Sequence, residues 1–241
     1  MKIAVVVPAL NEAVALPQTL QSLLAQARPA DRLVVVDGGS ADDTVAVAGR
    51  SGADAIVVTG RGRGGQVAVG VAACSEDVIV VGHADMLFPA DALAATEAHL
   101  EGRPGCPGGC LGHRFDRPGW VYRAIECWDR RRAMRGYSYG DQAQFFRRDL
   151  VGAFPDLPLM EDVELAGRLR RLGRPAYLDR PVTVSGRRYA RLGWVRVMWT
   201  NWTLRRAYER EGPDACWRLY RRYYSSRPPR KAANPATPWR P

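Results

Sequence analysis

The chain has 241 residues, 46% of them hydrophobic, and no stretch approaches the roughly 18–20 consecutive apolar residues of a membrane span. This excludes a membrane-spanning protein and predicts one α/β domain with a C-terminal extension. The formal net charge is +10, but residues 186–241 hold fourteen Lys and Arg against three Asp and Glu, so the body is nearly neutral. The basic tail predicts an anionic partner at the C-terminal end.

The first residues, MKIAVVVPAL, form a short strand-like run that is interrupted by Pro8 and does not fit a secretion signal. We therefore expect a cytoplasmic protein. The five cysteines are an odd number with no CxxC pair. Cys106, Cys110 and the nearby His113 resemble half of a zinc site. A structural zinc needs four ligands and no second pair follows, so reduced thiols are predicted there.

Four short β-branched runs alternate with segments of helical spacing in the first third of the chain. The runs cover residues 3–7, 33–36, 55–58 and 78–81, and helices are expected near 16–24, 44–48 and 67–72. Continuous apolar strands separated by helices are typical of a mainly parallel sheet with helices on both faces. The predicted fold class is therefore α/β.

The remainder of the chain is less regular, and no element is predicted between residues 114 and 135. The elements expected elsewhere are a helix from Pro89 to about Leu100, a loop over 102–113, a strand within 136–148 leading to a sheet edge, a helix from about Glu161, two short strands near 175–178 and 182–185, and a helical, aromatic stretch from Leu192 to Arg210.

Polar and glycine-rich segments follow each of the four early strands. They are PALNE (8–12), DGGS (37–40), GRGRGGQ (60–66) and HAD (83–85). In parallel sheets, ligands bind outside the carboxyl ends of the strands. One such segment alone is an ordinary turn, but four in succession predict a binding site at this edge.

The third segment satisfies the dinucleotide-binding pattern G-x-G-x-x-G through Gly60, Gly62 and Gly65, and Asp85 follows twenty residues later. In a dinucleotide-binding turn the motif ends the first strand of its unit. Here two strands precede it, and the arginines between the glycines suit phosphate binding through their side chains. An NAD-dependent oxidoreductase explains one of the four segments and is the minor alternative.

Six motifs, in this order, resemble those of family 2 glycosyltransferases of the GT-A fold: VVVPALNE, VVVDGGSADDT, GRGRGGQ, GHAD, GDQAQFFRR and LMEDVELAGRLRRLGR. The chain is similar to a bacterial subgroup of small, stand-alone transferases over roughly residues 2–188. The resemblance implies a nucleotide-diphospho-sugar donor, a divalent metal, and hexosyl transfer to a hydroxyl acceptor with inversion at the anomeric carbon. Within the family, UDP is the expected nucleotide of the donor. The resemblance divides the chain into a GT-A domain (1–188), basic aromatic helices (189–224) and a disordered tail (225–241).

Acids and glycines at the first two strand ends suit a nucleotide. The resemblance places Asp37 at the nucleobase and Glu12 near base or ribose, although Asp37 can instead cap a helix beginning near Ser40. Glycine beside them allows close backbone approach. The residues assigned to nucleotide-sugar binding are Pro8, Asn11, Glu12, Asp37, Gly38, Arg61, Arg63, Gln66, Ala84, Arg187 and Arg188.

The departing diphosphate needs positive charge. Asp85 stands at the last position of an aspartate-x-aspartate-like motif, where the resemblance implies a ligand for Mg²⁺ or Mn²⁺. The first position is His83, a departure from the family pattern that leaves fewer carboxylates for the metal. His83 suits a phosphate donor, a weak ligand or a packed residue. Arg187 and Arg188 suit either the diphosphate or the general charge of the tail.

Transfer with inversion needs a base on the acceptor side. Glu161 and Asp162 begin a helix, where backbone N–H groups stabilise negative charge, although acids are common in any first turn. The resemblance assigns the base to Asp162, which takes the acceptor's hydroxyl proton, and Glu161 then orients the acceptor. The residues expected to line the sugar or acceptor pocket are Gly140, Asp141 and Gln142. A nucleotidyltransferase of the same fold is the alternative.

The stretch LGWVRVMWTNWTLRRAYER places Val195, Met198, Trp199 and Trp202 on one helical face beside arginines. Such a face either packs on the domain core or lies in a membrane interface with arginines at anionic head groups. The second option suits a lipid-linked acceptor and a peripheral position on the inner face of a membrane, whereas small-molecule and glycan acceptors stay open. No basic patch on the body matches the tail, so nucleic acid is not an expected partner.

Overall fold

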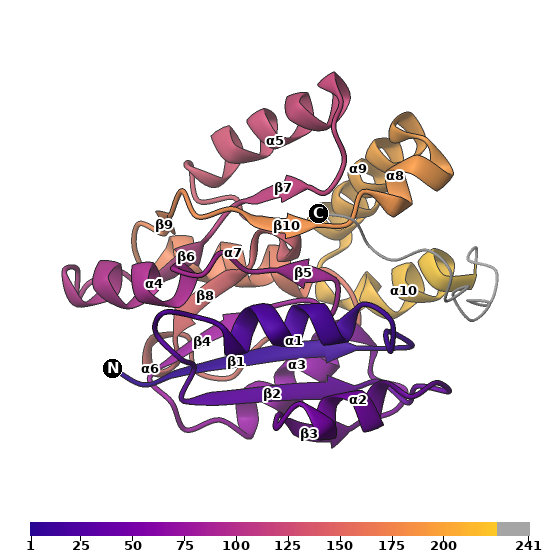
Figure 1. Ribbon diagram of the computed structural model, residues 1–241. Helices are drawn as coiled ribbons and strands as arrows, with labels where there is room; N and C mark the ends of the chain where they lie inside the picture. Colours follow the sequence, from indigo (N-terminus) through magenta and orange to yellow (C-terminus); the bar gives the residue numbers. More distant parts are fainter. Residues whose placement is uncertain (226–241) are drawn as a thin grey trace.

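The computed structural model describes residues 1–225, so the predicted disordered tail lies outside the described residues apart from Ser225. Its centre is a seven-stranded sheet (Figure 1). In spatial order the strands are β3 (Asp54–Val57), β2 (Arg32–Asp37), β1 (Ile3–Ala9), β4 (Val78–Val81), β8 (Gln144–Arg147), β6 (Gly108–Cys110) and β9 (Ala176–Tyr177). The first four strands pair in parallel and β8 runs antiparallel to both of its neighbours. The predicted α/β class with a mainly parallel sheet is confirmed.

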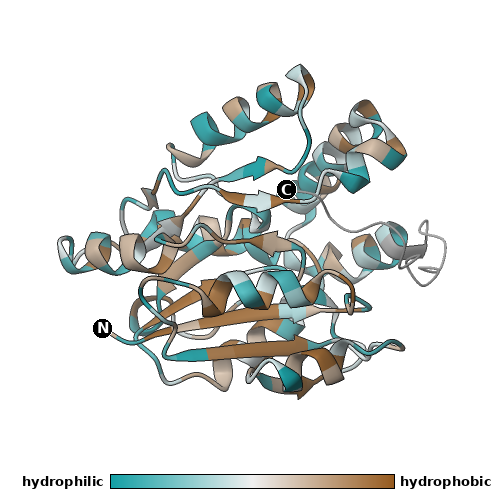
Figure 2. Cartoon of the chain, viewed as in Figure 1, coloured by the Kyte–Doolittle hydropathy of each residue, from teal (hydrophilic) through white to brown (hydrophobic). Residues whose placement is uncertain are grey.

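Helices cover both faces of this sheet because its central strands are apolar on both sides. In β1, Ile3, Val5 and Val7 face one core and Ala4 and Val6 face the other. Figure 2 shows the same central strands as strongly hydrophobic. The first core includes side chains of α1 (Leu16–Leu24), α2 (Thr44–Arg50) and α4 (Ala92–Glu101), and the second includes those of α3 (Gly62–Ala72), α6 (Arg148–Val151) and α7 (Glu161–Leu172).

The strand expected within 136–148 is β8, but it does not lie at a sheet edge. It pairs with β4 on one side and β6 on the other. Phe145 and Phe146 are both fully buried, and each enters a different core. The alternation of residue types in 136–148 did not indicate an edge strand, because both faces of β8 are covered by a hydrophobic core.

A second, three-stranded sheet lies beside the first and carries a helix that the sequence pattern did not predict. Its order is β5 (Met86–Leu87), β10 (Val182–Val184) and β7 (His113–Phe115), and α5 (Trp120–Ala133) packs on β7 (Figure 1). Only Ile125, Asp129 and Ala133 of α5 are buried, and one of these is an acid. The apolar periodicity was hidden because the tryptophans of this helix are exposed.

The C-terminal region forms three helices, α8 (Arg187–Leu192), α9 (Trp194–Glu211) and α10 (Cys216–Ser225), with a 3-10 turn η2 (Pro213–Ala215) before the last. The single helix expected from 192 to 210 is divided at Gly193, whose φ of +78° breaks the helical path. Leu204 and Tyr208 of α9 pack against Leu159 and Met160, the residues that lead into α7. The C-terminal helices thus support the segment that carries Asp162.

The apolar face expected on the C-terminal helix does not pack on the core. Val195, Met198, Trp199 and Trp202 are exposed by 61%, 38%, 63% and 48%. The core-packing alternative is therefore wrong for these four side chains, because α9 turns its other face, with Val197, Leu204 and Tyr208, toward the domain. Among residues 1–225, no helix combines the length and the apolar character that a membrane span needs.

Candidate active site

The parallel strands end in register, which brings their following loops to one edge of the sheet. Ala9 of β1 pairs with Asp37 of β2, and Asp37 pairs with Val57 of β3. The loop after β4, with His83 to Asp85, leaves the same edge next to β1. The 3-10 turn η1 (Gly140–Gln142) and the start of α7 complete the surroundings of this edge.

Asp37 is 2% exposed and organises the loop that follows β2. One carboxylate oxygen accepts the backbone N–H groups of Gly39 and Ser40, each at 2.8 Å, and the other accepts the Ser40 hydroxyl. Because α2 begins only at Thr44, Asp37 does not cap that helix. Asn11 has a φ of 53°, and its side-chain oxygen accepts the N–H of Ala41 at 2.8 Å, which joins the first two loops.

Gln66 braces the ends of β1 and β2 from below this loop. Its amide nitrogen donates to the carbonyl oxygens of Ala9 and Val36, both at 2.8 Å. A Cβ on Gly38 would lie 2.9 Å from the same nitrogen, so a larger residue there would have to displace the Gln66 amide from its two carbonyl partners. Pro8 is buried within β1 beneath the loop. These residues shape the floor of the site, where the Gln66 amide is bound by two backbone carbonyl oxygens.

The glycine-rich segment lets the first turn of α3 lie directly on the loop that precedes α7. Gly62 has a φ of +71°, and a Cβ there would lie 2.7 Å from the carbonyl oxygen of Pro158. At Gly64 a Cβ would overlap the carbonyl oxygen of Leu157 and lie 2.7 Å from the Cβ of Glu161. Packing of one protein segment on another therefore accounts for these glycines without any dinucleotide.

Two ion pairs fasten the same contact. Arg61 pairs with Asp156, and Arg63 pairs with the buried Glu161. Burial raises the pKa of the Glu161 carboxyl, although the charge of Arg63 opposes this. The arginines of the glycine-rich segment thus contact the entry to α7, which brings the third strand-end segment next to Asp162.

Asp85 and Glu12 converge on one guanidinium. The Nη2 atom of Arg187, the first residue of α8, lies 3.0 Å from Asp85 Oδ2 and 3.1 and 3.2 Å from the two oxygens of Glu12. Burial works to lower the pKa of Arg187, but the charges of Asp85 and Glu12 outweigh it and raise the pKa. Arg188 instead contacts Asn201 at 3.4 Å, on the side of the C-terminal helices.

Asp162 and His83 meet at Gly140. The backbone N–H of Gly140 donates to Asp162 Oδ2 at 2.8 Å, and Arg63 Nη2 lies 3.5 Å from the same oxygen. A Cβ on Gly140 would lie 3.1 Å from His83 Nε2 and 3.2 Å from Asp162 Oδ2. Burial, with the positive charge of Arg63, lowers the pKa of His83 to about 3, so its imidazole is neutral at neutral pH. His83 stands two residues before Asp85, and Ala84 between them accepts the Thr19 hydroxyl at 2.9 Å.

The structure also brings Asp141 close to two residues that the sequence analysis did not place at the site. Asp141 lies with His113 and Asp129 in one cluster, and neither of the latter two was predicted at the site. Gln142 is 1% exposed, and its side-chain oxygen accepts the N–H of Tyr139 at 3.0 Å, so it holds η1 in shape. The spacing of Ile125, Asp129 and Ala133, four residues apart, could have identified Asp129. It places an acid on the buried face of a helix, where a carboxylate needs a polar or charged partner.

All five cysteines are free, and the half zinc site does not form between cysteines and histidine. Cys106 and Cys110 are buried, Cys106 in the loop before β6 and Cys110 at the end of β6. Within the described residues, His113 is grouped with carboxylates only.

Residues 4–151 match the model of the protein family described as glycosyl transferase family 2. The chain belongs to glycosyl transferase family 2. Its family membership replaces the oxidoreductase interpretation of the glycine-rich segment, whose glycines are explained by packing. No curated protein sequence matches the chain.

Solved structures of glycosyltransferases share the GT-A fold of this family 2 member. S. aureus TarS 1-349 in complex with UDP-GlcNAc is 18% identical with a TM-score of 0.63, over 77% of this chain and 58% of that chain. Mannosyltransferase PcManGT from Pyrobaculum calidifontis, in complex with GDP-Man and Mn²⁺, is 22% identical with a TM-score of 0.63, over 86% of this chain and 61% of that chain. Glucosyl-3-phosphoglycerate synthase from Mycobacterium tuberculosis, in complex with Mn²⁺, UDP and glucosyl-3-phosphoglycerate, is 24% identical with a TM-score of 0.56, over 76% and 70%.

The family 2 chain spans about 60% of the length of the first matched structure. The family match ends at residue 151, so it covers Asp37, Asp85 and Asp141 but neither Asp162 nor Arg187. The assignment of those two residues to the site rests on their contacts with Gly140 and with Asp85.

Proposed function

We propose that this protein is an inverting, metal-dependent glycosyltransferase. It moves a sugar from a nucleotide-diphospho-sugar, for which we propose a UDP-linked sugar, to an acceptor hydroxyl. One observation carries the proposal. Asp162 is held by the Gly140 N–H at the point where His83 approaches, and His83 leads directly into Asp85. A carboxylate suited to deprotonate an acceptor therefore stands beside the loop suited to hold a diphosphate.

The donor side offers a match for both the nucleoside and the diphosphate. Asp37 and Glu12 lie at neighbouring strand ends, where an acid can accept an N–H of the base or a hydroxyl of the ribose. Arg187 brings a cation next to Asp85, and it can turn toward phosphate oxygens once its carboxylate partners are engaged elsewhere. Charge of this kind stabilises the diphosphate as it leaves.

The residues present fit a hard divalent cation. Glu12 and Asp85 are oxygen donors that already converge on one positive group, the Arg187 guanidinium, which stands in the place that a cation would take. Mg²⁺ and Mn²⁺ prefer such oxygen ligands, and Asp85 would be the principal one. When bound, the ion would neutralise charge that develops on the leaving diphosphate. His83 is neutral and does not compete with the ion by charge.

On the acceptor side, Asp162 is the proposed base. It would take the proton of the acceptor hydroxyl while the acceptor oxygen bonds to the anomeric carbon and the bond from that carbon to the diphosphate oxygen breaks. The Gly140 N–H and the Arg63 guanidinium orient its carboxylate. Glu161 is bound to Arg63 and is buried, so we assign it to positioning Arg63 and, through it, the base.

The test uses Asp162→Asn with Asp149→Asn as the matched control, because Asp149 is an exposed acid on α6, away from the site. General bases contribute about 10²–10⁴-fold to rate. Turnover should therefore fall at least about 100-fold in Asp162→Asn, with nucleotide affinity retained, while the control keeps normal turnover. Near-normal turnover in Asp162→Asn would remove Asp162 from the role of base.

The donor and the reaction class are tested together. UDP- and GDP-linked sugars are each screened by thermal shift with and without Mn²⁺, followed by analysis of the released product. A nucleoside diphosphate supports sugar transfer. Release of pyrophosphate from a nucleoside triphosphate would instead establish the nucleotidyltransferase alternative. Asp85→Ala should weaken the Mn²⁺-dependent part of nucleotide affinity, and unchanged titrations would exclude Asp85 as the ligand.

We also propose that the protein docks on an anionic lipid surface through α5 and α9. Trp120, Trp128 and Trp194 are exposed by 77%, 66% and 48%. Together with Met198 they line an apolar groove of about 180 Å³ between the two helices. The same helix, α5, also carries the exposed arginines Arg123, Arg130 and Arg131, and the tail carries most of the net charge. Exposed tryptophans beside arginines suit the boundary of an anionic bilayer.

Vesicle sedimentation tests this surface. Wild type should bind phosphatidylglycerol-containing vesicles and not phosphatidylcholine vesicles, and the double variant Trp120→Ser/Trp128→Ser should lose most of the binding. Trp217→Ser is the control, because Trp217 is also an exposed tryptophan, at 49%, but lies on α10 outside the groove. Equal binding by the double variant would refute the proposal, and so would a dimer in light scattering that the double variant abolishes.

A further inference from the structure

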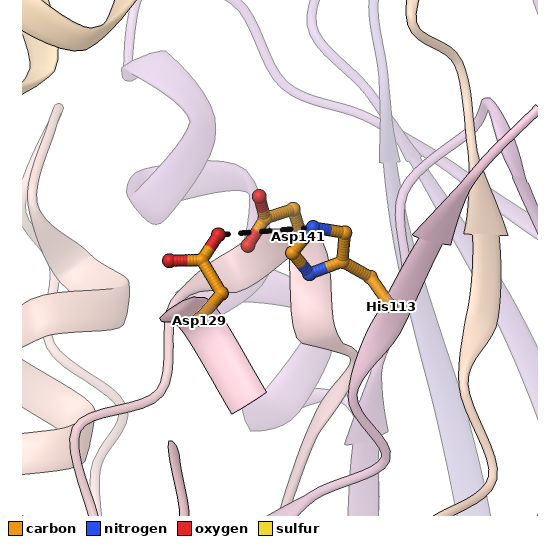
Figure 3. Close-up of side chains that lie close together, drawn as sticks. All are labelled: His113, Asp129 and Asp141. Carbon is orange, nitrogen blue, oxygen red and sulfur yellow. Dashed lines mark ion pairs between the residues drawn. The ribbon is translucent and has the colours of Figure 1, made fainter. Parts of the chain in front are cut away.

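A second cluster of potential metal ligands lies outside the donor site. His113 of β7, Asp129 of α5 and Asp141 of η1 point toward one another (Figure 3), and one ligand atom from each lies within 4.8 Å of the others. Among residues 1–225 this is the only group of three such side chains that could hold an ion. The three residues come from three different elements, so the fold alone brings them together.

His113 is buried and its ring is unsatisfied. The side chain is 1% exposed, and neither ring nitrogen has a hydrogen-bond partner among the described residues. Its Nε2 atom lies 3.7 Å from Asp129 Oδ2, too far for a hydrogen bond. A buried imidazole without a hydrogen-bond partner costs free energy, so this ring is placed for a group that the protein itself does not supply.

The two carboxylates are arranged so that each keeps an oxygen for such a group. Asp129 Oδ1 lies 3.0 Å from Arg132 Nη2, which leaves Oδ2 facing His113. Arg132 is itself held, because its Nε donates to the Tyr137 carbonyl oxygen at 3.0 Å and its guanidinium lies 3.4 Å from the centre of the Tyr139 ring. Asp141 Oδ1 is buried without a hydrogen-bond partner.

We propose that His113, Asp129 and Asp141 bind a divalent transition-metal ion of the zinc type, separately from the metal of the nucleotide. One imidazole nitrogen and two carboxylate oxygens form a three-ligand set that Zn²⁺ accepts, with a fourth position left for solvent. The ion pair with Arg132 holds the Asp129 carboxylate on the side away from His113, in the way that outer groups orient ligating carboxylates elsewhere. Bonds of about 2.0–2.2 Å to the ion require the ligand atoms to close by about an ångström, which side-chain rotation supplies.

A proton shared within the cluster does not explain the arrangement as well. One proton can join two of the three atoms, which leaves a buried polar atom unpaired, whereas one ion satisfies all three at once. The cluster is also distinct from the donor site, because Asp85 and Glu12 lie on the loops of β4 and β1 and contact Arg187 instead.

The ion would hold the turn that positions the proposed base. Asp141 directly follows Gly140, whose N–H binds Asp162. An ion at Asp141 would tie η1 to β7 and α5 and so keep Gly140 against Asp162. The three side chains are positioning residues in this account. The proposal concerns binding, and it stands or falls independently of which sugar is transferred.

The experiment uses the full chain without affinity tags, stripped with a chelator and titrated with ZnCl₂ in a calorimeter. Wild type should bind one equivalent and gain melting temperature. Asp129→Asn and His113→Gln should each lose at least about 100-fold in zinc affinity. Two controls, Asp85→Asn and Cys127→Ser, should bind like wild type, because they alter the donor site and the exposed cysteine.

The X-ray absorption spectrum of the zinc-loaded wild type gives a second measurement that does not depend on variants folding. Nitrogen and oxygen neighbours at about 2.0–2.2 Å with an imidazole contribution support the site. A sulfur neighbour at about 2.3 Å overturns it. Absence of zinc binding by folded wild type, or full binding by folded Asp129→Asn and His113→Gln, overturns it as well.

Discussion

Replacing Gly64 by alanine tests whether the glycine-rich segment exists for packing or for a ligand. Gly64 is the third residue of α3, where alanine is otherwise the better helix former by about 1 kcal/mol. Helix propensity alone therefore predicts a gain in stability. The tertiary contact predicts the opposite, because the new methyl group would meet the backbone of the loop before α7.

The magnitude follows from the contact. The Cβ would overlap the Leu157 carbonyl oxygen and would lie 2.7 Å from the Glu161 Cβ, whereas real Cβ atoms essentially never come within 3.0 Å of another heavy atom. A backbone carbonyl cannot rotate away as a side chain does, so α3 and the loop must separate. Overpacking of this kind costs about 1–3 kcal/mol net. For a chain of this length, that lowers the melting temperature by about 2–4 °C per kcal/mol.

The same separation should disturb catalysis. Arg63, next to Gly64, pairs with Glu161 and reaches Asp162, so a shift of α3 moves the proposed base. A displacement near 1 Å can cost about 100-fold in rate. The assays are thermal unfolding without nucleotide and initial rates with saturating donor.

Gly49→Ala is the matched control, since Gly49 lies in helix α2 and a Cβ there would meet nothing within 4 Å. This variant should be as stable as wild type or more stable by up to about 1 kcal/mol. If Gly64→Ala proves equally stable and loses only donor affinity, Gly64 serves close approach of the ligand and the packing argument is wrong.

Two further predictions concern stability. Asp37→Ala should lower the unfolding free energy by about 2 kcal/mol without any nucleotide present, because the N–H groups of Gly39 and Ser40 lose their acceptor; a melting temperature equal to that of wild type would contradict this. The hydrogen bond from Arg28 lowers the pKa of Glu97, so this pair stabilises the fold above the unfolded pKa of about 4.5 and stops doing so as pH falls through the lowered value. Arg28→Met should therefore flatten the fall of melting temperature below pH 5, and an unchanged acid slope would refute it.

The β-branched runs and the polar residues that follow them were sufficient to predict the parallel strands in the first third of the chain. Val5 to Val7 and Val34 to Val36 lie in continuous β-branched runs, and buried parallel strands need such runs because both faces are covered. Parallel pairing then brings every strand end to one edge, so Asp37 and Asp85 could be expected close together from sequence alone.

Apolar spacing in the sequence failed to predict the structure where apolar side chains are exposed and polar side chains are buried. In α5 the tryptophans are exposed and Asp129 is buried, which reverses the usual rule and hid the helix. Apolar spacing also allows Trp199 to be a core residue, yet it lies on the outer face of α9. Periodicity reports apolar spacing, but it does not report which face meets the domain.

The sequence by itself determined the strands of the first half, their mainly parallel class, the edge at which the polar strand ends gather, and the family to which the motifs point. The tertiary structure decided the partners: Arg187 with Asp85, Asp162 with Gly140, and His113 with two aspartates. The members of these pairs lie between 16 and 102 residues apart in the chain. Their geometry depends on how helices and loops pack, and a local sequence pattern carries no information about that packing.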